Sequence, residues 1–151
     1  RWQETHQRLM RLGGIKRVAG LEELAQRCEI LSFHVPSLTE TRGLIDASLL
    51  ARMAPGTIIV NTSRGDIIDE PALIAAMDEK GIRAGLDVFN SEPAMGKCAF
   101  ASALARHPNV YGTHHIGAST EQAQAAVAEG VIEIVDAFEL GEVRHCVNMP
   151  V

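Results

Sequence analysis

The stretch TIIVNTSRGDIIDEPALIAAMDEKGIRAGLDV, residues 57–88, contains one complete strand–helix–strand unit. Its two ends, TIIVNTS and RAGLDV, are short apolar runs of the kind found in buried strands. Between them, Asp69 is placed to cap a helix over 69–80. Pro71 lies in the first turn of this helix, and Gly81 is placed to end it. Two strands joined by such a helix predict a parallel pair with a right-handed crossover.

The same alternation of strands and helices continues on both sides of this unit. Asp46 is a second helix-capping residue, and a sheet of parallel strands covered by helices is expected. The further predicted elements are strands at 29–35 and 109–113, a short strand near 16–19, and helices at 3–12, 21–27, 46–53 and 100–106.

The last predicted helix has the strongest periodicity in the sequence. Small and apolar residues recur at spacings of three and four from Ala123 to Phe138, which is the pattern of one buried helix face. Ser119 and Gln122 have the spacing of a capping box at its start. We interpret the apolar stripe as core packing.

Composition excludes several classes of function. The chain has 151 residues, a size expected for one domain, and a net charge of −5 with its 14 basic residues scattered. This argues against a nucleic-acid partner. No apolar run reaches the ~18 residues that a membrane span needs, so no membrane partner and a cytoplasmic location are expected. The three cysteines, Cys28, Cys98 and Cys146, lack the spacing of a disulfide framework or a zinc knuckle.

Polar side chains follow the predicted strands at the points where the strands end. Ligands of open parallel sheets bind outside the carboxyl ends of the strands. The residues at these positions are His34, Val35 and Pro36 after the first strand, Ser63 and Arg64 after the second, Asn90 and Glu92 after the third, and His114, His115 and Gly117 after the fourth.

An arginine, a glutamate and a histidine at one edge of a sheet suit a proton-coupled reaction of a small anion. A guanidinium binds a carboxylate in a fork and polarises a neighbouring carbonyl. An imidazole, whose ordinary pKa is about 6.5, moves a proton near neutral pH. A carboxylate on the other ring nitrogen orients the imidazole and favours its charged form. These residues predict an acid–base site without specifying the reaction.

Four motifs together resemble the D-isomer-specific 2-hydroxyacid dehydrogenases. The resemblance covers essentially the whole chain and implies a Rossmann-like cofactor domain that binds NAD. It also implies hydride transfer between NAD and a small-molecule 2-hydroxy or 2-oxo acid, and it is closest to the members that act on 3-phosphoglycerate in serine biosynthesis. The motifs are HVPSLTETRGLI (34–45), NTSRGDIIDEPAL (61–73), GLDVFNSEP (85–93) and NVYGTHHIGASTEQAQ (109–124).

The resemblance also implies a role for each site residue. Arg64 would bind the substrate carboxylate and carbonyl, Glu92 would orient the catalytic histidine, and His115 would be the acid–base. His114 stands where the family more often has proline, and alternation along an extended segment predicts that His114 and His115 point to opposite sides. The cofactor contacts implied by the resemblance are His34, Val35, Pro36, Thr62, Ser63, Arg64, Asp87, His115 and Gly117.

The sequence departs from the family pattern in one respect. No G-x-G-x-x-G motif occurs in it, and neither does the acidic ribose-binding residue that follows about 20 positions later. We therefore expect residues 1–151 to be a partial NAD-binding domain that lacks the first strands, the glycine-rich turn and the substrate domain. Weak NAD binding, little turnover by this chain alone and a homodimer that covers exposed apolar surface are expected. The choice between NAD and NADP stays open.

Other interpretations remain open at this point. The substrate could be another 2-oxo acid such as glyoxylate or lactate, or the chain could be a non-catalytic NAD-sensing module of the corepressor type. A glycosidase pair of Asp87 and Glu92 is disfavoured because nothing marks a sugar cleft. A zinc site is disfavoured because its candidate ligands have no recognised spacing; these are His107, His114, His115 and Cys98.

Overall fold

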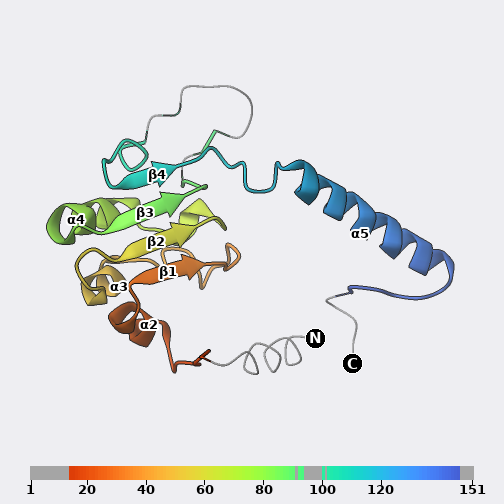
Figure 1. Cartoon of the computed structure of the whole chain (residues 1–151), viewed down its shortest axis with the longest axis horizontal. Coiled ribbons are helices and arrows are strands. Elements are labelled where there is room, and N and C mark those ends of the chain that lie inside the picture. The colour runs from red at the N-terminus through yellow and green to blue at the C-terminus, as the bar shows by residue number, and fades with distance from the viewer. Residues whose placement is uncertain (1–13, 91, 94–99, 101, 147–151) are drawn as a thin grey trace. The chain divides into compact units, whose positions relative to one another are not determined.

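The computed structural model describes residues 14–90, 92–93, 100 and 102–146. The chain divides into two compact units, at residues 1–112 and 113–151. The first unit contains a parallel sheet with its helices, and the second contains one long helix, α5 (Glu121–Glu139) (Figure 1). The predicted helix at 3–12 lies outside the described residues.

The sheet has four parallel strands in the order β1-β2-β3-β4. These strands confirm the four main strand predictions, although each is shorter at its ends. In the register, Ile59 pairs with Leu31 on one side and with Ala84 on the other. The strands are β1 (Ile30–Phe33), β2 (Ile58–Asn61), β3 (Arg83–Leu86) and β4 (Val110–Gly112).

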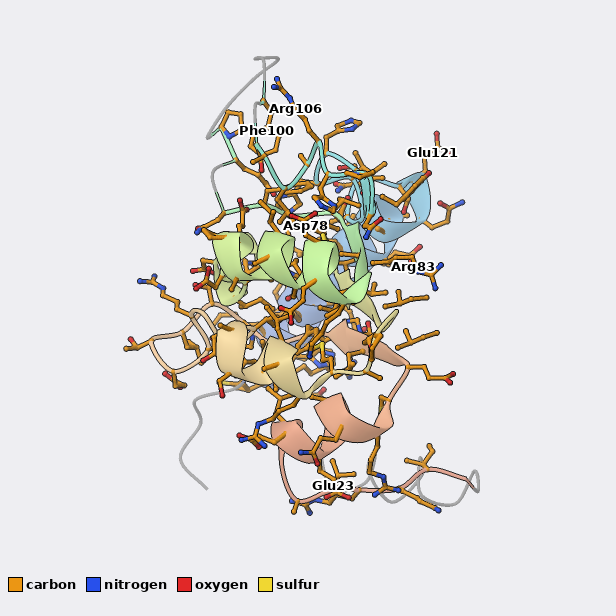
Figure 2. The ribbon with its side chains drawn as sticks, turned by 90° about the vertical axis from the view of Figure 1, so that its left-hand side faces the viewer. Glu23, Asp78, Arg83, Phe100, Arg106 and Glu121 are labelled. Carbon is orange, nitrogen blue, oxygen red and sulfur yellow. The ribbon has the colours of Figure 1, made fainter. Side chains whose placement is uncertain are left out.

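Three helices form one layer beside the sheet (Figure 2). They are α2 (Leu21–Arg27), α3 (Ala47–Arg52) and α4 (Glu70–Lys80), and a short 3-10 turn, η1 (Gly65–Ile67), precedes α4. Every second residue of β1, β2 and β3 is buried, whereas the residues between them are exposed or half-buried. One face of the sheet is therefore covered and the other is open within the described part of this unit.

The core lies between the covered face and the helix layer. Three residues of this core are fully buried: Ile59 of β2, Leu73 of α4 and Ile45 in the loop before α3. Full burial of such a side chain contributes about 1.5–3 kcal/mol relative to leaving it exposed. The apolar residues whose pattern predicted an α/β fold are thus the residues whose burial stabilises it.

Capping residues confirm the predicted starts of α3 and α4. The side chain of Asp46 accepts a hydrogen bond from the Leu49 N–H, and that of Asp69 accepts one from the Ala72 N–H. Gly81 ends α4 with φ 64°, in the left-handed region that favours glycine. In α2, Glu23 accepts a hydrogen bond from the Ala19 N–H, and this bond together with Arg27 lowers the pKa of Glu23.

Two predicted elements are wrong. Residues 15–18 form no strand, and no described strand pairs with them, so an extended segment there lacks the ladder that would stabilise it. Residues 103–106 form turns rather than a helix. Pro108 follows too soon for a longer helix, and His107 holds the segment to α4 through a 3.2 Å contact between its Nε2 and the Asp78 Oδ1.

The second unit corrects two details of the last helix. The N-cap of α5 is Thr120, whose side chain accepts a hydrogen bond from the Ala123 N–H, and not Ser119. The apolar stripe is not core packing in the described residues, because only Ala137 of the helix is buried. Val127 is 65% exposed and Phe138 is 73% exposed. Across the described part of the chain, no helix combines the length and the apolar character needed to cross a membrane.

Candidate active site

The polar residues predicted after β1, β2 and β3 lie at one edge of the first unit. Because the three strands are parallel and in register, their carboxyl ends meet at that edge. His34, Val35 and Pro36 follow β1, Thr62, Ser63 and Arg64 follow β2, and Asp87 and Glu92 follow β3.

The turn that carries Arg64 is built around the side chain of Asn61. Asn61 is fully buried at the end of β2. Its Nδ2 donates to the Arg64 carbonyl oxygen at 2.8 Å. Its Oδ1 accepts hydrogen bonds from the Ser63 N–H at 3.0 Å and from the Ser63 hydroxyl at 2.8 Å. The Arg64 side chain is exposed and donates from Nη1 to the Ser63 carbonyl oxygen, so its other donors can face a bound anion.

The same turn lies directly against the segment that leads to Glu92. A Cβ atom added to Gly65 would be 2.1 Å from the Phe89 carbonyl carbon and 2.5 Å from the Asn90 nitrogen. Glu92 Oε1 accepts a hydrogen bond of 2.5 Å from the Phe89 N–H. The structure therefore brings together the two backbone segments that carry Arg64 and Glu92.

Two further carboxylates hold these loops in place. Glu70, in the first turn of α4, accepts a hydrogen bond from the Asn90 N–H at 2.8 Å. Asp66 joins the loop after β1 to the Arg64 turn: its Oδ2 accepts from the Ser37 hydroxyl at 2.5 Å and lies 3.2 Å from the Arg42 Nε. All three carboxyl-end loops of the first unit are thus connected by hydrogen bonds.

A largely apolar groove lies beside β1. It has a cavity volume of about 330 Å³. His34 is at its end, and the His34 Nε2 lies 2.8 Å from the Ser32 Oγ. Its lining residues are Leu21, Leu24, Cys28, Ile30, Leu31, Ser32, Phe33, His34, Val35 and Leu44.

His115 belongs to the second unit and has an unusual backbone conformation. Its φ is 59°, in the left-handed region that residues other than glycine seldom occupy. The prediction that His114 and His115 lie on an extended segment is therefore wrong, and the alternation argument does not apply to them. Residues held in this region are concentrated at functional sites. The contact between Glu92 and His115 stays a prediction.

The sequence analysis did not predict the residues whose hydrogen bonds hold the loops of the site in place. Asn61, Asp66 and Glu70 do not belong to any predicted catalytic set. For Asn61 a signal was available, because a polar residue inside an apolar strand has to find hydrogen-bond partners. No group of three or more histidine, cysteine, aspartate or glutamate side chains suited to a metal occurs among the described residues, which do not include Cys98.

Comparisons with known proteins agree with this architecture. The family model described as D-isomer specific 2-hydroxyacid dehydrogenase, NAD binding domain, matches residues 3–117. The chain therefore belongs to the D-isomer specific 2-hydroxyacid dehydrogenases, in which this domain binds NAD.

Among individual proteins, the chain is similar to D-3-phosphoglycerate dehydrogenases. It is 37% identical to that of Haemophilus influenzae over 141 residues, covering 92% of this chain and 34% of the relative. It is 41% identical to that of Methanocaldococcus jannaschii over 139 residues, covering 91% of this chain and 26% of the relative. The chain thus spans about a third or less of the length of these curated relatives.

Solved structures show the same fold. The apo form of Rhodotorula graminis D-mandelate dehydrogenase matches with a TM-score of 0.73 and 37% identity, covering 83% of this chain and 35% of that chain. Aquifex aeolicus D-lactate dehydrogenase complexed with NAD and lactic acid matches with a TM-score of 0.67 and 29% identity, covering 85% of this chain and 45% of that chain. The parallel sheet with its helices is therefore part of a Rossmann-like cofactor domain, as predicted.

Proposed function

We propose that the protein transfers hydride between NAD and a D-2-hydroxy acid, with Arg64, Glu92 and His115 as the catalytic residues. The observation that carries this proposal is the direct contact between the Arg64 turn and the segment of Glu92, at the edge where ligands of parallel sheets bind. Family membership supplies the reaction class.

The residues of the first unit fit part of the cofactor. The apolar groove that ends at His34 and Val35 suits the adenosine, with Pro36 beside it. Thr62, Ser63 and Arg64 would lie beside the nicotinamide, and Asp87, His115 and Gly117 near its carboxamide. NAD supplies hydride transfer at C4 of its nicotinamide ring.

The protein residues would bind the substrate and move its proton. The Arg64 guanidinium would hold the carboxylate in a fork and draw charge onto the C2 oxygen. His115 would take the hydroxyl proton in the oxidation direction and return it to the carbonyl oxygen in the reduction direction. Glu92 would orient the imidazole and favour its charged form. Two electrons and one hydrogen leave C2 as hydride, and one proton leaves the oxygen.

The substrate we favour is 3-phosphoglycerate, as in serine biosynthesis, in a cytoplasmic homodimer. The support for it is the similarity to D-3-phosphoglycerate dehydrogenases over more than nine-tenths of the chain. A second candidate is a smaller 2-hydroxy acid, because solved structures similar to the chain include D-mandelate and D-lactate dehydrogenases. A non-catalytic NAD-sensing module is the alternative from another class.

An assay of the full-length gene product tests the proposal. NADH oxidation is measured with 3-phosphohydroxypyruvate, pyruvate, phenylglyoxylate and glyoxylate. We expect the phosphorylated acid to give the highest kcat/KM, and Arg64→Ala and His115→Ala each to lower it by at least about 100-fold. The control is Arg52→Ala, which removes an exposed arginine on α3 and should change kcat/KM less than twofold. NADH binding without turnover of any acid would favour the sensing module.

A further inference from the structure

We infer that Asn61 is a positioning residue that sets the direction of the Arg64 side chain. The inference rests on the proposed function, since it concerns how the substrate-binding arginine is held. Asn61 touches neither substrate nor cofactor in this account, and it acts through the backbone of residues 63 and 64.

The surroundings of Asn61 make its hydrogen bonds obligatory. In the register of the sheet it lies between Phe33 of β1 and Leu86 of β3, which are 5% and 2% exposed. An amide in such surroundings is destabilising unless its polar atoms are paired. An apolar residue would suit this strand position better for packing alone, so the amide has to be explained by what it bonds.

The three side-chain hydrogen bonds of Asn61 go to Ser63 and Arg64, two and three residues further along the chain. The amide donates to the Arg64 carbonyl oxygen and accepts from the N–H and the hydroxyl of Ser63. Its backbone oxygen accepts a hydrogen bond from the Asp87 N–H at 3.0 Å, which fixes Asn61 itself to the neighbouring segment. The amide is thus a rigid template on which the turn closes.

This template matters because the Arg64 side chain has little other support. Arg64 is exposed, and its Nη1 contact reaches only the adjacent Ser63 carbonyl oxygen. Its backbone is held by Asn61 on one side and by the packing of Gly65 on Phe89 on the other. Displacement of a substrate-positioning group by about 1 Å costs about 100-fold in rate, so loosening of this turn should be visible in catalysis.

Kinetics of the full-length gene product test the inference against a merely structural role. Asn61→Leu keeps the number and branching of the side-chain heavy atoms and removes the three hydrogen bonds. Thr57→Val is the matched control, because Thr57 is also buried beside β2 and donates to the Ala54 carbonyl oxygen at the opposite end of the strand. We expect Asn61→Leu to raise KM for the 2-oxo acid and lower kcat/KM about 10- to 100-fold, with a smaller rise in KM for NADH, because the same turn also carries the proposed nicotinamide contacts. Thr57→Val should leave both KM values unchanged.

A double-mutant cycle with Arg64→Ala shows whether the loss of kcat/KM in Asn61→Leu is transmitted through Arg64. If Asn61 acts through Arg64, Asn61→Leu causes no further loss of kcat/KM in the Arg64→Ala background. A loss that multiplies with that of Arg64→Ala overturns the inference. Asn61→Ala serves in the same cycle if Asn61→Leu does not fold.

Amide hydrogen exchange of the 151-residue chain gives a readout that needs no activity. In Asn61→Leu the Ser63 N–H should exchange at least tenfold faster, whereas the Asp87 N–H, which bonds the backbone oxygen of residue 61, keeps its protection. Unchanged exchange of Ser63 overturns the inference whatever the enzyme assay shows. Absence of turnover with faster Ser63 exchange instead contradicts the proposed function and leaves the template geometry supported.

Discussion

At Gly65, the candidate site depends on the absence of a side chain. The contact between Gly65 and the Phe89 backbone joins the loops of Arg64 and Glu92, and the atoms nearest to an added Cβ are backbone atoms that cannot rotate away. The close approach of the two loops therefore requires a glycine at this position.

Replacement of Gly65 by alanine should therefore separate the two loops. We expect Gly65→Ala to destabilise the domain by about 1–3 kcal/mol, the usual cost of overpacking, and to lower kcat/KM of the full-length gene product more than tenfold. Urea unfolding and the NADH assay measure the two effects. Gly85→Ala is the control, because a Cβ at Gly85 has no atom within 4 Å and should be tolerated. Equal effects of the two substitutions on stability and kcat/KM would show that the close contact between Gly65 and Phe89 is not the cause of either effect.

Residue-level reasoning from the sequence predicted which backbone segments meet at the edge of the sheet. Arg64 and Glu92 were placed at one edge of the sheet because each follows a strand, and the structure brings their segments together. Asn61 and Glu70 were missed because their role depends on hydrogen bonds to distant or turning backbone, which no spacing rule reveals.

At the scale of elements, helix α3 is anchored by a residue of another helix. Its C-terminal carbonyl groups receive the ammonium group of Lys80, whose Nζ donates to the carbonyl oxygens of Leu50, Ala51 and Met53 at 3.1, 2.6 and 3.2 Å. A cation at the C-terminal end of a helix is stabilised by the helix dipole as well as by these bonds.

We expect Lys80→Met to lower the free energy of unfolding by about 1–2 kcal/mol, since the apolar stem is kept while the charged hydrogen bonds are lost. The midpoint of urea unfolding reports the change. Lys16→Met removes an exposed lysine ahead of α2 and should shift the midpoint very little. If the two variants unfold at the same urea concentration, the Lys80 contacts contribute nothing measurable.

The helix with a signal at both ends was predicted well, whereas two weakly marked elements were not. The helix over 69–80 had Asp69 and Gly81, and α4 has both as caps. The predicted strand near 16–19 rested on a few apolar residues, and strand formation needs a partner that local sequence does not specify. The helix predicted at 100–106 had no capping residue ahead of it and no glycine after it, and residues 103–106 form turns.

At the scale of the whole molecule, both units expose apolar side chains. On the open face of the sheet Ile30 is 60% exposed, and Tyr111 of β4 is 80% exposed. In α5, Val131 and Ile132 are 54% and 59% exposed. Exposed apolar side chains on an open sheet face or along a helix are characteristic of interaction sites.

We predict that the 151-residue chain forms homodimers, because self-association would bury part of this surface. Light scattering at increasing protein concentration measures the mass in solution. Replacement of Tyr111 by serine should weaken the association if the open face takes part, whereas Arg52→Ala should leave it unchanged. A monomer at every concentration tested would show that this surface does not drive self-association.

We also predict that residues 1–151 alone bind NADH weakly. The sequence contains no G-x-G-x-x-G motif, and the turn formed by that motif supplies the backbone N–H groups that bind the pyrophosphate. Calorimetry should give an affinity weaker than low-micromolar. Low-micromolar binding would mean that the described residues hold the cofactor without a phosphate-binding turn.

The most direct test of the account is a crystal structure of the full-length gene product with NADH and oxamate, a non-reacting analogue of a 2-oxo acid. We predict that the Glu92 carboxylate lies within hydrogen-bond distance of one ring nitrogen of His115, that the other ring nitrogen faces the oxamate, and that the Arg64 guanidinium grips the oxamate carboxylate. A Glu92 side chain turned away from His115, with Arg64 extended into solvent, would contradict the proposed dehydrogenase site.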